Sequence, residues 1–275
     1  MPLVAITREM GSLGKDVAQG LSEALGIPLV YHEVIDQLAD RMRVRKSHVI
    51  RLLDGKAGLL ERLTADKTSL SIFSADEVVG LALKQGGAVI RGWGATHLLR
   101  GIPHAVCVRV CAPFEVRKER MLERVGSSDE RKITEEIQQN DEAHTAIMRR
   151  NFSVNWTESE HYDVVLNTQR VSIDGCVDEV LKLVRSAEFN ETDATRQRLQ
   201  DLGLAWHVRA ALRLSQRTRD VHVSVSADRG RVTLEGVLQG ADERTAVREV
   251  AGGVAGVQEV DDRLRTADDV RPRFH

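Results

Sequence analysis

Cysteine, proline and aromatic residues are all scarce in this chain. Its 275 residues include three cysteines, five prolines and 4% aromatic residues. An odd, sparse set of thiols cannot form a disulfide framework and is typical of a reducing compartment. Cys107 and Cys111 flank an alternating valine run, and Cys176 stands alone. We expect strand positions for the first two rather than metal binding, because no second Cys or His pair has the spacing of a zinc site.

The chain also lacks a large net charge and a long apolar run. Its formal net charge of -2 gives no overall attraction to nucleic acid or to an anionic membrane. The apolar start MPLVAI is too short for a signal peptide and has no basic flank. No run of about 18 apolar residues is present to span a bilayer. These features predict a cytoplasmic protein with neither nucleic acid nor membrane as partner.

Short apolar strands alternate with helical patterns over the first two hundred residues. Strands are predicted at 3–7, 26–31, 86–92, 104–113 and 162–168, and helices at 15–25, from 114, at 129–150 and from 173. This alternation predicts an α/β fold in which a parallel sheet is covered by helices on both faces. The predicted extent of this domain is 1–187.

The pattern changes after residue 187. The polar segment 188–203 is predicted to be a linker, and a short amphipathic helix follows in AWHVRAALRLS. Residues 204–268 then read as a small α+β domain. It would contain a β-hairpin around the turn ADRG, a helix in ADERTAVREVAGGV and a third strand in GVQEVDDRLRT. The inward-facing hairpin residues are predicted to be Val221, Val223, Val225, Val232 and Leu234.

The stretch ITREMGSLGKDVAQ, residues 6–19, has the layout of a loop that cradles phosphate. Such a loop offers backbone N–H groups and a helix N-terminus to the anion. The strict spelling G-x-x-x-x-G-K-[ST] is nevertheless broken at both ends, since Glu9 stands at the first glycine and Asp16 at the hydroxyl residue. On local sequence alone, a strand-turn-helix corner without a ligand is an equal alternative.

The predicted helix that starts at residue 114 has a one-sided charge distribution. At 100° per residue, Arg117, Arg120 and Arg124 fall on one side and the glutamates on the other. Like charges four residues apart repel slightly, and such an arginine stripe suits a polyphosphate. The alternative is a solvated helix whose arginines meet carboxylates elsewhere.

Taken in order, several segments resemble two known families. ITREMGSLGKDVAQGLSEALGIPLVYHEVID, AVIRGWGA, VRVCAPFEVRKERMLERV, NDEAHTAIMRRNF and YDVVLNT resemble the cytidylate kinase-like family of P-loop kinases. RVTLEGVL and VAGVQEV resemble a BON domain. The first resemblance implies a nucleoside monophosphate kinase fold, ATP and Mg²⁺, with transfer of the γ-phosphoryl group to a small acceptor such as CMP. For the BON-like domain, the mixed charges of its polar face favour a protein or small-ligand partner.

The resemblance also implies roles for individual residues. Arg117 and Arg120 would belong to the lid over ATP, and Asp141, on the lid helix, and Lys15 would join them in catalysis. Asp16 could bind Mg²⁺ or only favour the helix N-terminus. Asn167 could touch the base or cap the next turn. The implied nucleotide-binding set is Arg8, Gly11, Ser12, Gly14, Lys15, Asp16 and Asn167, and the implied acceptor set is Tyr31, Arg91 and Trp93.

Four positions depart from the family pattern. Leu13 replaces a glycine, where a positive φ would be unfavourable. Trp93 replaces the acceptor-binding arginine, and Arg91, two residues earlier, would point to the wrong face unless the chain bends. His144 replaces a lid arginine but is mostly neutral at pH 7. Tyr31 stands in place of a carboxylate. Two interpretations follow: a kinase with an altered acceptor, or an inactive pseudokinase acting as nucleotide sensor or interaction scaffold.

Overall fold

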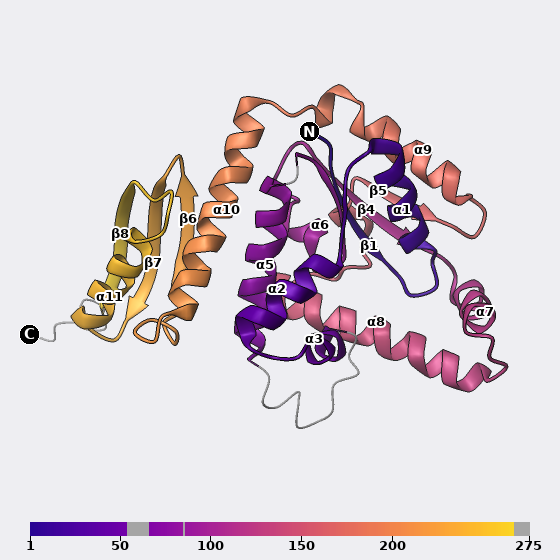
Figure 1. Ribbon diagram of the computed structural model, residues 1–275, viewed down its shortest axis with the longest axis horizontal. Helices are drawn as coiled ribbons and strands as arrows, with labels where there is room; N and C mark the ends of the chain where they lie inside the picture. Colours follow the sequence, from indigo (N-terminus) through magenta and orange to yellow (C-terminus); the bar gives the residue numbers. More distant parts are fainter. Residues whose placement is uncertain (54–65, 85, 267–275) are drawn as a thin grey trace, which may run out of the picture.

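The structure is a computed structural model that describes residues 1–53, 66–84 and 86–266. A five-stranded sheet forms the centre of the N-terminal part (Figure 1). All its neighbouring strands are parallel, which confirms the predicted sheet. Its order is β2 (Leu29–Val30), β3 (Ala88–Arg91), β1 (Leu3–Arg8), β4 (Ala105–Cys111) and β5 (Val164–Asn167).

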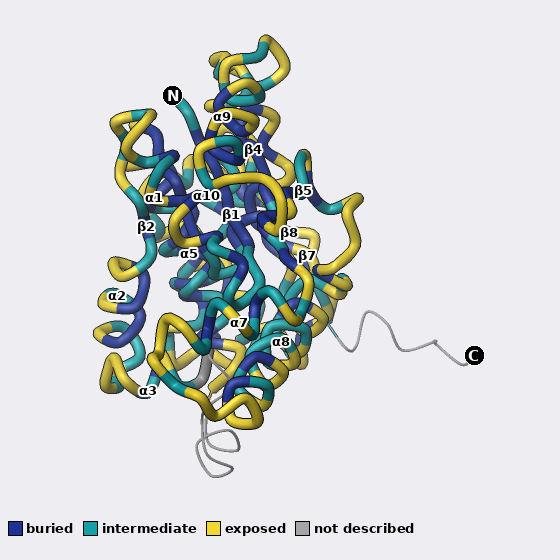
Figure 2. Tube along the Cα trace, turned by 90° about the vertical axis from the view of Figure 1, so that its right-hand side faces the viewer, coloured by how far each residue is buried: buried dark blue, intermediate teal, exposed yellow. Residues whose placement is uncertain are grey.

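Helices cover both faces of this sheet, and each face has its own hydrophobic core. Along β1, Val4 and Ile6 belong to the core under α1 (Gly14–Leu25) and α9 (Ile173–Val184). The alternate residues Leu3 and Ala5 belong to the opposite core. That second core also contains residues of α2 (His32–Met42), α3 (Lys46–Leu53), α5 (Lys67–Lys84) and α6 (Ala95–Leu98). The strands therefore lie between two helical layers (Figure 1), and β1 and β4 are mostly buried (Figure 2).

Two further helices follow β4, namely α7 (Phe114–Val125) and α8 (Glu130–Phe152). They join through a small cluster of Met121, Ile133 and Ile137. Single turns of 3₁₀ helix occur at η1 (Ser159–His161) and η2 (Ala187–Phe189). In the part of the chain that the structure describes, no helix is both long enough and apolar enough to cross a membrane.

The C-terminal part is a three-stranded sheet with one helix of its own, α11 (Ala241–Gly252). The strands β6 (Ser224–Asp228) and β7 (Arg231–Leu238) form the predicted antiparallel hairpin, and β8 (Glu259–Thr266) pairs with β7 in parallel. The predicted inward residues Val225, Val232 and Leu234 are buried, whereas Val221 and Val223 precede the strand and are partly buried.

The connection between the two parts differs from the prediction. Where a linker at 188–203 and a short helix were expected, the chain forms one continuous 22-residue helix, α10 (Asp193–Leu214). Thr192 caps its N-terminus by accepting a hydrogen bond from the Thr195 backbone N–H at 3.2 Å. The polar composition at its start is therefore that of a capped, exposed first turn rather than of a linker.

The helix α10 packs on two sides at once, between α5 and the C-terminal sheet (Figure 1). Leu199 and Ala210 join the core that contains α5, whereas Ala205, Val208 and Leu212 join the C-terminal core. Apolar residues on two faces do not give the single stripe of an amphipathic helix. This explains why periodicity predicted a shorter, one-sided helix here.

Candidate functional site

In the loop between β1 and α1, Leu13 has the positive φ that the sequence analysis considered unfavourable for a residue other than glycine. Gly11 has φ +82°, and Leu13 lies in the left-handed region with φ +59°. This conformation costs a non-glycine residue on the order of 1–2 kcal/mol, so the loop holds strain that glycine would avoid. Gly14 begins α1, whose N-terminal N–H groups face the loop.

Both glycines of this loop are required by close contacts. A Cβ atom on Gly11 would lie 2.7 Å from the carbonyl oxygen of Arg117, and one on Gly14 would lie 2.6 Å from the Cβ of Arg8. The loop is therefore pressed against α7 on one side and against the end of β1 on the other. Because neither residue has a side chain, the loop can approach these neighbours closely.

Among the predicted phosphate ligands, Lys15 and Ser12 differ in their exposure and in their hydrogen bonds to the protein. Lys15 is exposed, and its ammonium has no hydrogen-bond or ion-pair partner among the described residues. Ser12 is fully buried; its hydroxyl donates to the Val110 carbonyl at 3.1 Å and its N–H to the Glu9 carbonyl at 3.2 Å. Both donors of Ser12 are thus used inside the protein, which argues against the predicted phosphate contact. Lys15 is free to reach an anion.

Asp16 and Asn167 occupy the ends of their elements. Asp16 is exposed in the first turn of α1, where a carboxylate is favoured by the helix dipole. Asn167 is exposed and ends β5, and its Oδ1 accepts a hydrogen bond from the Gln169 N–H at 3.0 Å. The turn-capping alternative for Asn167 is therefore the contact present in the structure.

Two arginines of α7 form hydrogen bonds with neighbouring parts of the protein. Arg117 is 6% exposed and pairs with both oxygens of Asp141 on α8, at 3.2 and 2.9 Å. Arg120 donates to the Thr168 hydroxyl at 2.9 Å and to the Thr168 carbonyl at 2.8 Å, whereas Arg124 is exposed. The alternative that the arginines of this helix pair with carboxylates therefore holds for Arg117. The predicted lid residues Arg117 and Asp141 bind each other.

Glu9 and Arg109 form a contact that the sequence did not suggest. The Arg109 guanidinium donates to Glu9 at 2.6 Å, and the same carboxylate accepts from the Ala112 N–H at 3.2 Å. The Nε of Arg117 lies 3.5 Å from Glu9 as well. The residue that breaks the strict loop spelling therefore anchors the loop to β4 and α7. That break was the one signal in the sequence for its role.

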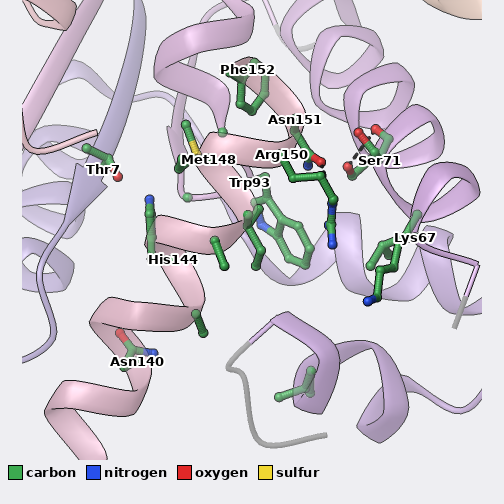
Figure 3. Close-up of a pocket in the computed structure, with 18 of the residues that line it drawn as sticks. Thr7, Lys67, Ser71, Trp93, Asn140, His144, Met148, Arg150, Asn151 and Phe152 are labelled. Atoms are coloured by element: carbon green, nitrogen blue, oxygen red, sulfur yellow. Dashed lines mark hydrogen bonds between the residues drawn. The ribbon is translucent and has the colours of Figure 1, made fainter. Parts of the chain in front are cut away.

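A cavity of about 810 Å³ opens beside the loop, between the ends of β1 and β3 and the helices α2, α3, α5 and α8 (Figure 3). Its walls bring together Tyr31, Arg91, Trp93 and His144, which lie far apart in the sequence. The predicted acceptor residues thus share one cavity. Lining residues that the sequence did not suggest include Thr7, Lys67, Ser71, Met148, Arg150, Asn151 and Phe152.

Arg91 lines this cavity, which the sequence argument allowed only if the chain bends after the strand. The chain bends directly after β3, since Gly92, Trp93 and Gly94 have φ values of +81°, +62° and +72°. Arg91 is 6% exposed, and its guanidinium lies 3.9 Å from the centre of the Tyr31 ring. Burial, and then the positive charge of Arg8, lowers the pKa of Arg91. The group is thus a buried cation without an ion pair among the described residues, and the charge of Asp16 offsets only part of the lowering.

Three side chains of the cavity wall have a buried nitrogen without a hydrogen-bond partner among the described residues. These are the Nε of Arg91, the indole Nε1 of Trp93 and the imidazole Nε2 of His144. Buried polar atoms are normally satisfied, so three such atoms around one cavity indicate a polar occupant. Trp93 and Tyr31, with ring centres 5.9 Å apart, add an aromatic surface beside them.

The environment of His144 keeps its imidazole neutral. Its ring packs against Trp156 at 4.2 Å, and burial followed by the charge of Arg8 lowers its pKa to about 4. The sequence-based expectation that histidine does not supply a permanent positive charge here agrees with this environment. Arg8 and Arg109 are the arginines whose charge acts on His144.

Buried neutral histidines make stability depend on pH. His97, like His144, has its pKa lowered to about 4, mainly by burial. The unfolded chain, with histidine pKa values near 6.5, binds more protons between about pH 6.5 and pH 4. We therefore expect the free energy of unfolding to fall as the pH drops through this window. Urea unfolding at about pH 7 and about pH 5 should show the loss in the wild type and a smaller loss in His144→Gln.

The exposed Gln216, whose side chain carries no titratable group, provides a control for this test. Gln216→Ala should leave the pH dependence as it is in the wild type. An equal loss of stability in the wild type and in His144→Gln would contradict the assignment.

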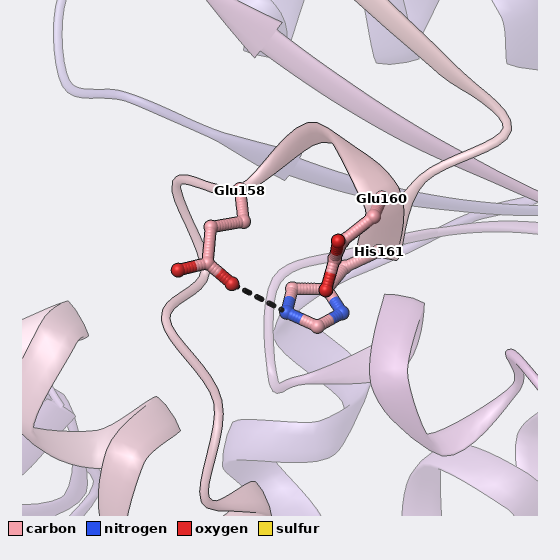
Figure 4. A group of neighbouring side chains, drawn as sticks. All are labelled: Glu158, Glu160 and His161. Carbon is pink, nitrogen blue, oxygen red and sulfur yellow. Dashed lines mark ion pairs between the residues drawn. The ribbon is translucent and has the colours of Figure 1, made fainter.

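One group of described side chains has a geometry that could hold a metal ion. Ligand atoms of Glu158, Glu160 and His161 all lie within 4.8 Å of one another (Figure 4). Glu158 and His161 already form an ion pair at 3.5 Å, and both carboxylates are exposed. These mutual contacts account for the group, and we assign it no metal. The predicted magnesium ligand Asp16 does not belong to it.

A parallel sheet with a phosphate loop before its first helix, and a cavity at the carboxyl ends of its strands, defines a P-loop kinase-like domain. The chain belongs to the cytidylate kinase-like family, which it matches over residues 3–170, and a BON domain follows at residues 200–268. No curated protein matches the chain.

Three solved structures are similar to the chain, and the first of them, with a TM-score above 0.5, supports the fold. An uncharacterized protein from Eubacterium ventriosum ATCC 27560 is 22% identical, with a TM-score of 0.53, covering 68% of this chain and 99% of its own. Shikimate kinase from Acinetobacter baumannii, solved with shikimate, is 13% identical (TM-score 0.42; 69% and 96% covered). Shikimate kinase from Bacteroides thetaiotaomicron is 15% identical (TM-score 0.40; 67% and 99% covered).

Proposed function

We propose that the N-terminal domain binds a nucleoside triphosphate with Mg²⁺ at the phosphate loop and a small acceptor in the neighbouring cavity. We further propose that it transfers the γ-phosphoryl group slowly. The observation that carries the proposal is a cavity of about 810 Å³ lined by the buried Arg91 and by Arg8, the last residue of β1 before the loop. At the start of α1, the Lys15 ammonium has no hydrogen-bond or ion-pair partner among the described residues.

The chemistry of such a transfer is mostly positioning and charge neutralisation. The N-terminus of α1 and Lys15 would hold the phosphates, and Asp16 would contact the magnesium ion, which would neutralise phosphate charge. The acceptor would place an anionic group on Arg91, which has no carboxylate partner among the described residues. The indole of Trp93 would offer an aromatic surface and an N–H donor.

The proposed slow rate follows from the arginines. Arg117 is held by Asp141 and Arg120 by Thr168, and His144 is neutral. An arginine that acts on the transferring phosphoryl group can be worth about a thousandfold or more in rate. A site whose candidate arginines bind protein groups therefore lacks much of this acceleration until those contacts rearrange.

A second candidate is a non-catalytic nucleotide sensor that acts through the C-terminal domain. The continuous helix α10 favours it, because this helix packs on α5 of the kinase-like domain and on β6 of the BON domain. Under this proposal the BON domain recognises a protein or a small ligand. Nucleotide binding would then change that contact rather than produce a new phosphate ester.

Thermal melting with nucleotides tests the proposal. Mg-ATP at a hundredfold over its Kd should stabilise the wild type by about 2.7 kcal/mol. Lys15→Gln should lose most of this shift, because the loop then has no side-chain cation at that position. The matched control is Lys182→Gln, which removes an exposed lysine on α9 that pairs with Glu179. It should keep the full shift.

The outcomes separate the candidates. No shift with any nucleotide would contradict both candidates and leave a structural scaffold. A shift with ATP, together with slow formation of ADP in the presence of a nucleoside monophosphate, supports the kinase. A shift with ATP and no diphosphate product by chromatography supports the sensor.

A further inference from the structure

A second cavity, of about 350 Å³, lies at the seam between the two domains. It is lined by Thr68 and Ile72 of α5, by residues of α10, and by the segment 218–224 that leads into β6. Its charged and titratable lining groups are Arg209, Arg213, Arg219 and His222, and no carboxylate of the described residues lines it. A small cavity with three guanidinium groups and no acid in its wall is suited to an anion.

Arg209 is the least compensated of these cations. It is half-buried, its guanidinium donates to the Val225 carbonyl at 2.9 Å, and it lies 4.4 Å from the Trp206 ring centre. Burial lowers the pKa of Arg209, and no carboxylate in the described part of the chain pairs with it. A partly desolvated cation is unfavourable without an opposite charge, and a bound anion would supply that charge.

Arg213 is already neutralised and helps to hold the seam together. It donates to both oxygens of Asp66 at 2.9 and 2.8 Å and to the Ser69 hydroxyl at 2.7 Å. The surplus positive charge of the cavity therefore comes from Arg209 and from the exposed Arg219. The hydroxyl residues Thr68 and Ser224 line the same space.

From this arrangement we propose that the seam cavity binds a small phosphorylated molecule. Guanidinium groups match the oxygens of phosphate in pairs, and two arginines without an ion-pair partner among the described residues suit a group with more than one negative charge. A cavity of about 350 Å³ holds a small molecule. The site is distinct from the phosphate loop, and its existence does not depend on the proposed kinase activity.

The occupant would touch both domains at once. On α5, Thr68 and Ile72 line the seam cavity, whereas Lys67, Leu70, Ser71 and Ser74 of the same helix line the large cavity. A ligand at the seam would therefore contact the helix that forms one wall of the candidate acceptor site. Binding at either cavity is expected to change the affinity at the other by the same factor.

Calorimetric titration with inorganic pyrophosphate and with glycerol 3-phosphate tests the site. The full chain should carry Lys15→Gln, so that the phosphate loop does not contribute. At least one probe should bind at one site, and Arg209→Gln and Arg219→Gln should each weaken its binding about tenfold or more. The matched control is Arg217→Gln; Arg217 is exposed, pairs with Glu249 and does not line the cavity.

Two results would overturn the proposal. One is the absence of binding by both probes at about 10 mM, a concentration at which even a site with a Kd of about 1 mM would be mostly occupied. The other is binding that Arg217→Gln weakens as much as Arg219→Gln does. Circular dichroism checks that the variants fold; should Arg209→Gln unfold, the exposed Arg219 decides the test. Failure of ATP to bind the wild type would leave this result unaffected.

Discussion

Replacing Gly11 by alanine is expected to destabilise the protein by about 3 kcal/mol and to abolish phosphate binding at the loop. Gly11 has φ +82°, and a Cβ there would lie 2.7 Å from the backbone oxygen of Arg117. The left-handed conformation costs about 1–2 kcal/mol for alanine, and a clash with backbone that cannot rotate away adds about 1–3 kcal/mol. Urea unfolding and Mg-ATP titration of the variant measure the two effects.

Gly26→Ala is the matched control for this prediction. Gly26 also has a positive φ, +65°, but a Cβ there would have no atom within 4 Å. It should cost only the conformational term of about 1–2 kcal/mol and leave nucleotide affinity unchanged. Equal losses of stability and of affinity in both variants would show that contact with α7 does not fix the loop.

Asp76→Ala is the second substitution with a large expected effect, a loss of about 3 kcal/mol. Asp76 is 4% exposed and binds Arg41 and His207, each at 2.7 Å. Removing one partner of a buried charge pair costs about 3–5 kcal/mol, and Glu77, which also binds Arg41 at 2.6 Å, offsets part of this. The melting temperature should fall by roughly 6–10 °C. Because His207 belongs to α10, the contact between the two domains should loosen as well.

The exposed pair of Arg217 and Glu249 gives the control for Asp76. Their side chains are each 58% exposed and lie 2.7 Å apart. Glu249→Gln should change stability by less than about 1 kcal/mol, as exposed ion pairs do. If Glu249→Gln lost as much stability as Asp76→Ala, burial would not be the reason that the contacts of Asp76 contribute strongly to stability.

The parallel sheet and the hairpin could be predicted because their signals are local. Strands such as β4 are mostly apolar, and Val232 and Leu234 alternate with polar residues along β7. The helix α10 could not be predicted in full, because Leu199 and Ala205 face different cores. Periodicity reports a single buried face, and α10 has two.

The candidate site was predictable in membership and less so in geometry. Tyr31, Arg91 and Trp93, which motif order assigned to one acceptor site, line one cavity. The pairing of Arg117 with Asp141 depends on how α7 packs against α8, and the periodicity of each helix gives no information about that packing. The bend that turns Arg91 into the cavity depends on three consecutive positive φ values, one of them at a tryptophan. No propensity rule would place a tryptophan there.

The central claim is that the loop binds a nucleotide through Lys15 while the tied arginines keep transfer slow. The most direct test is titration of the wild type and of Lys15→Gln with Mg-ATP, with ADP formation measured in the same samples. We predict saturable binding by the wild type, much weaker binding by Lys15→Gln, and turnover well below the roughly 1–100 s⁻¹ typical of kinases. Equal binding by both proteins, no binding by the wild type, or turnover within that range would contradict the claim.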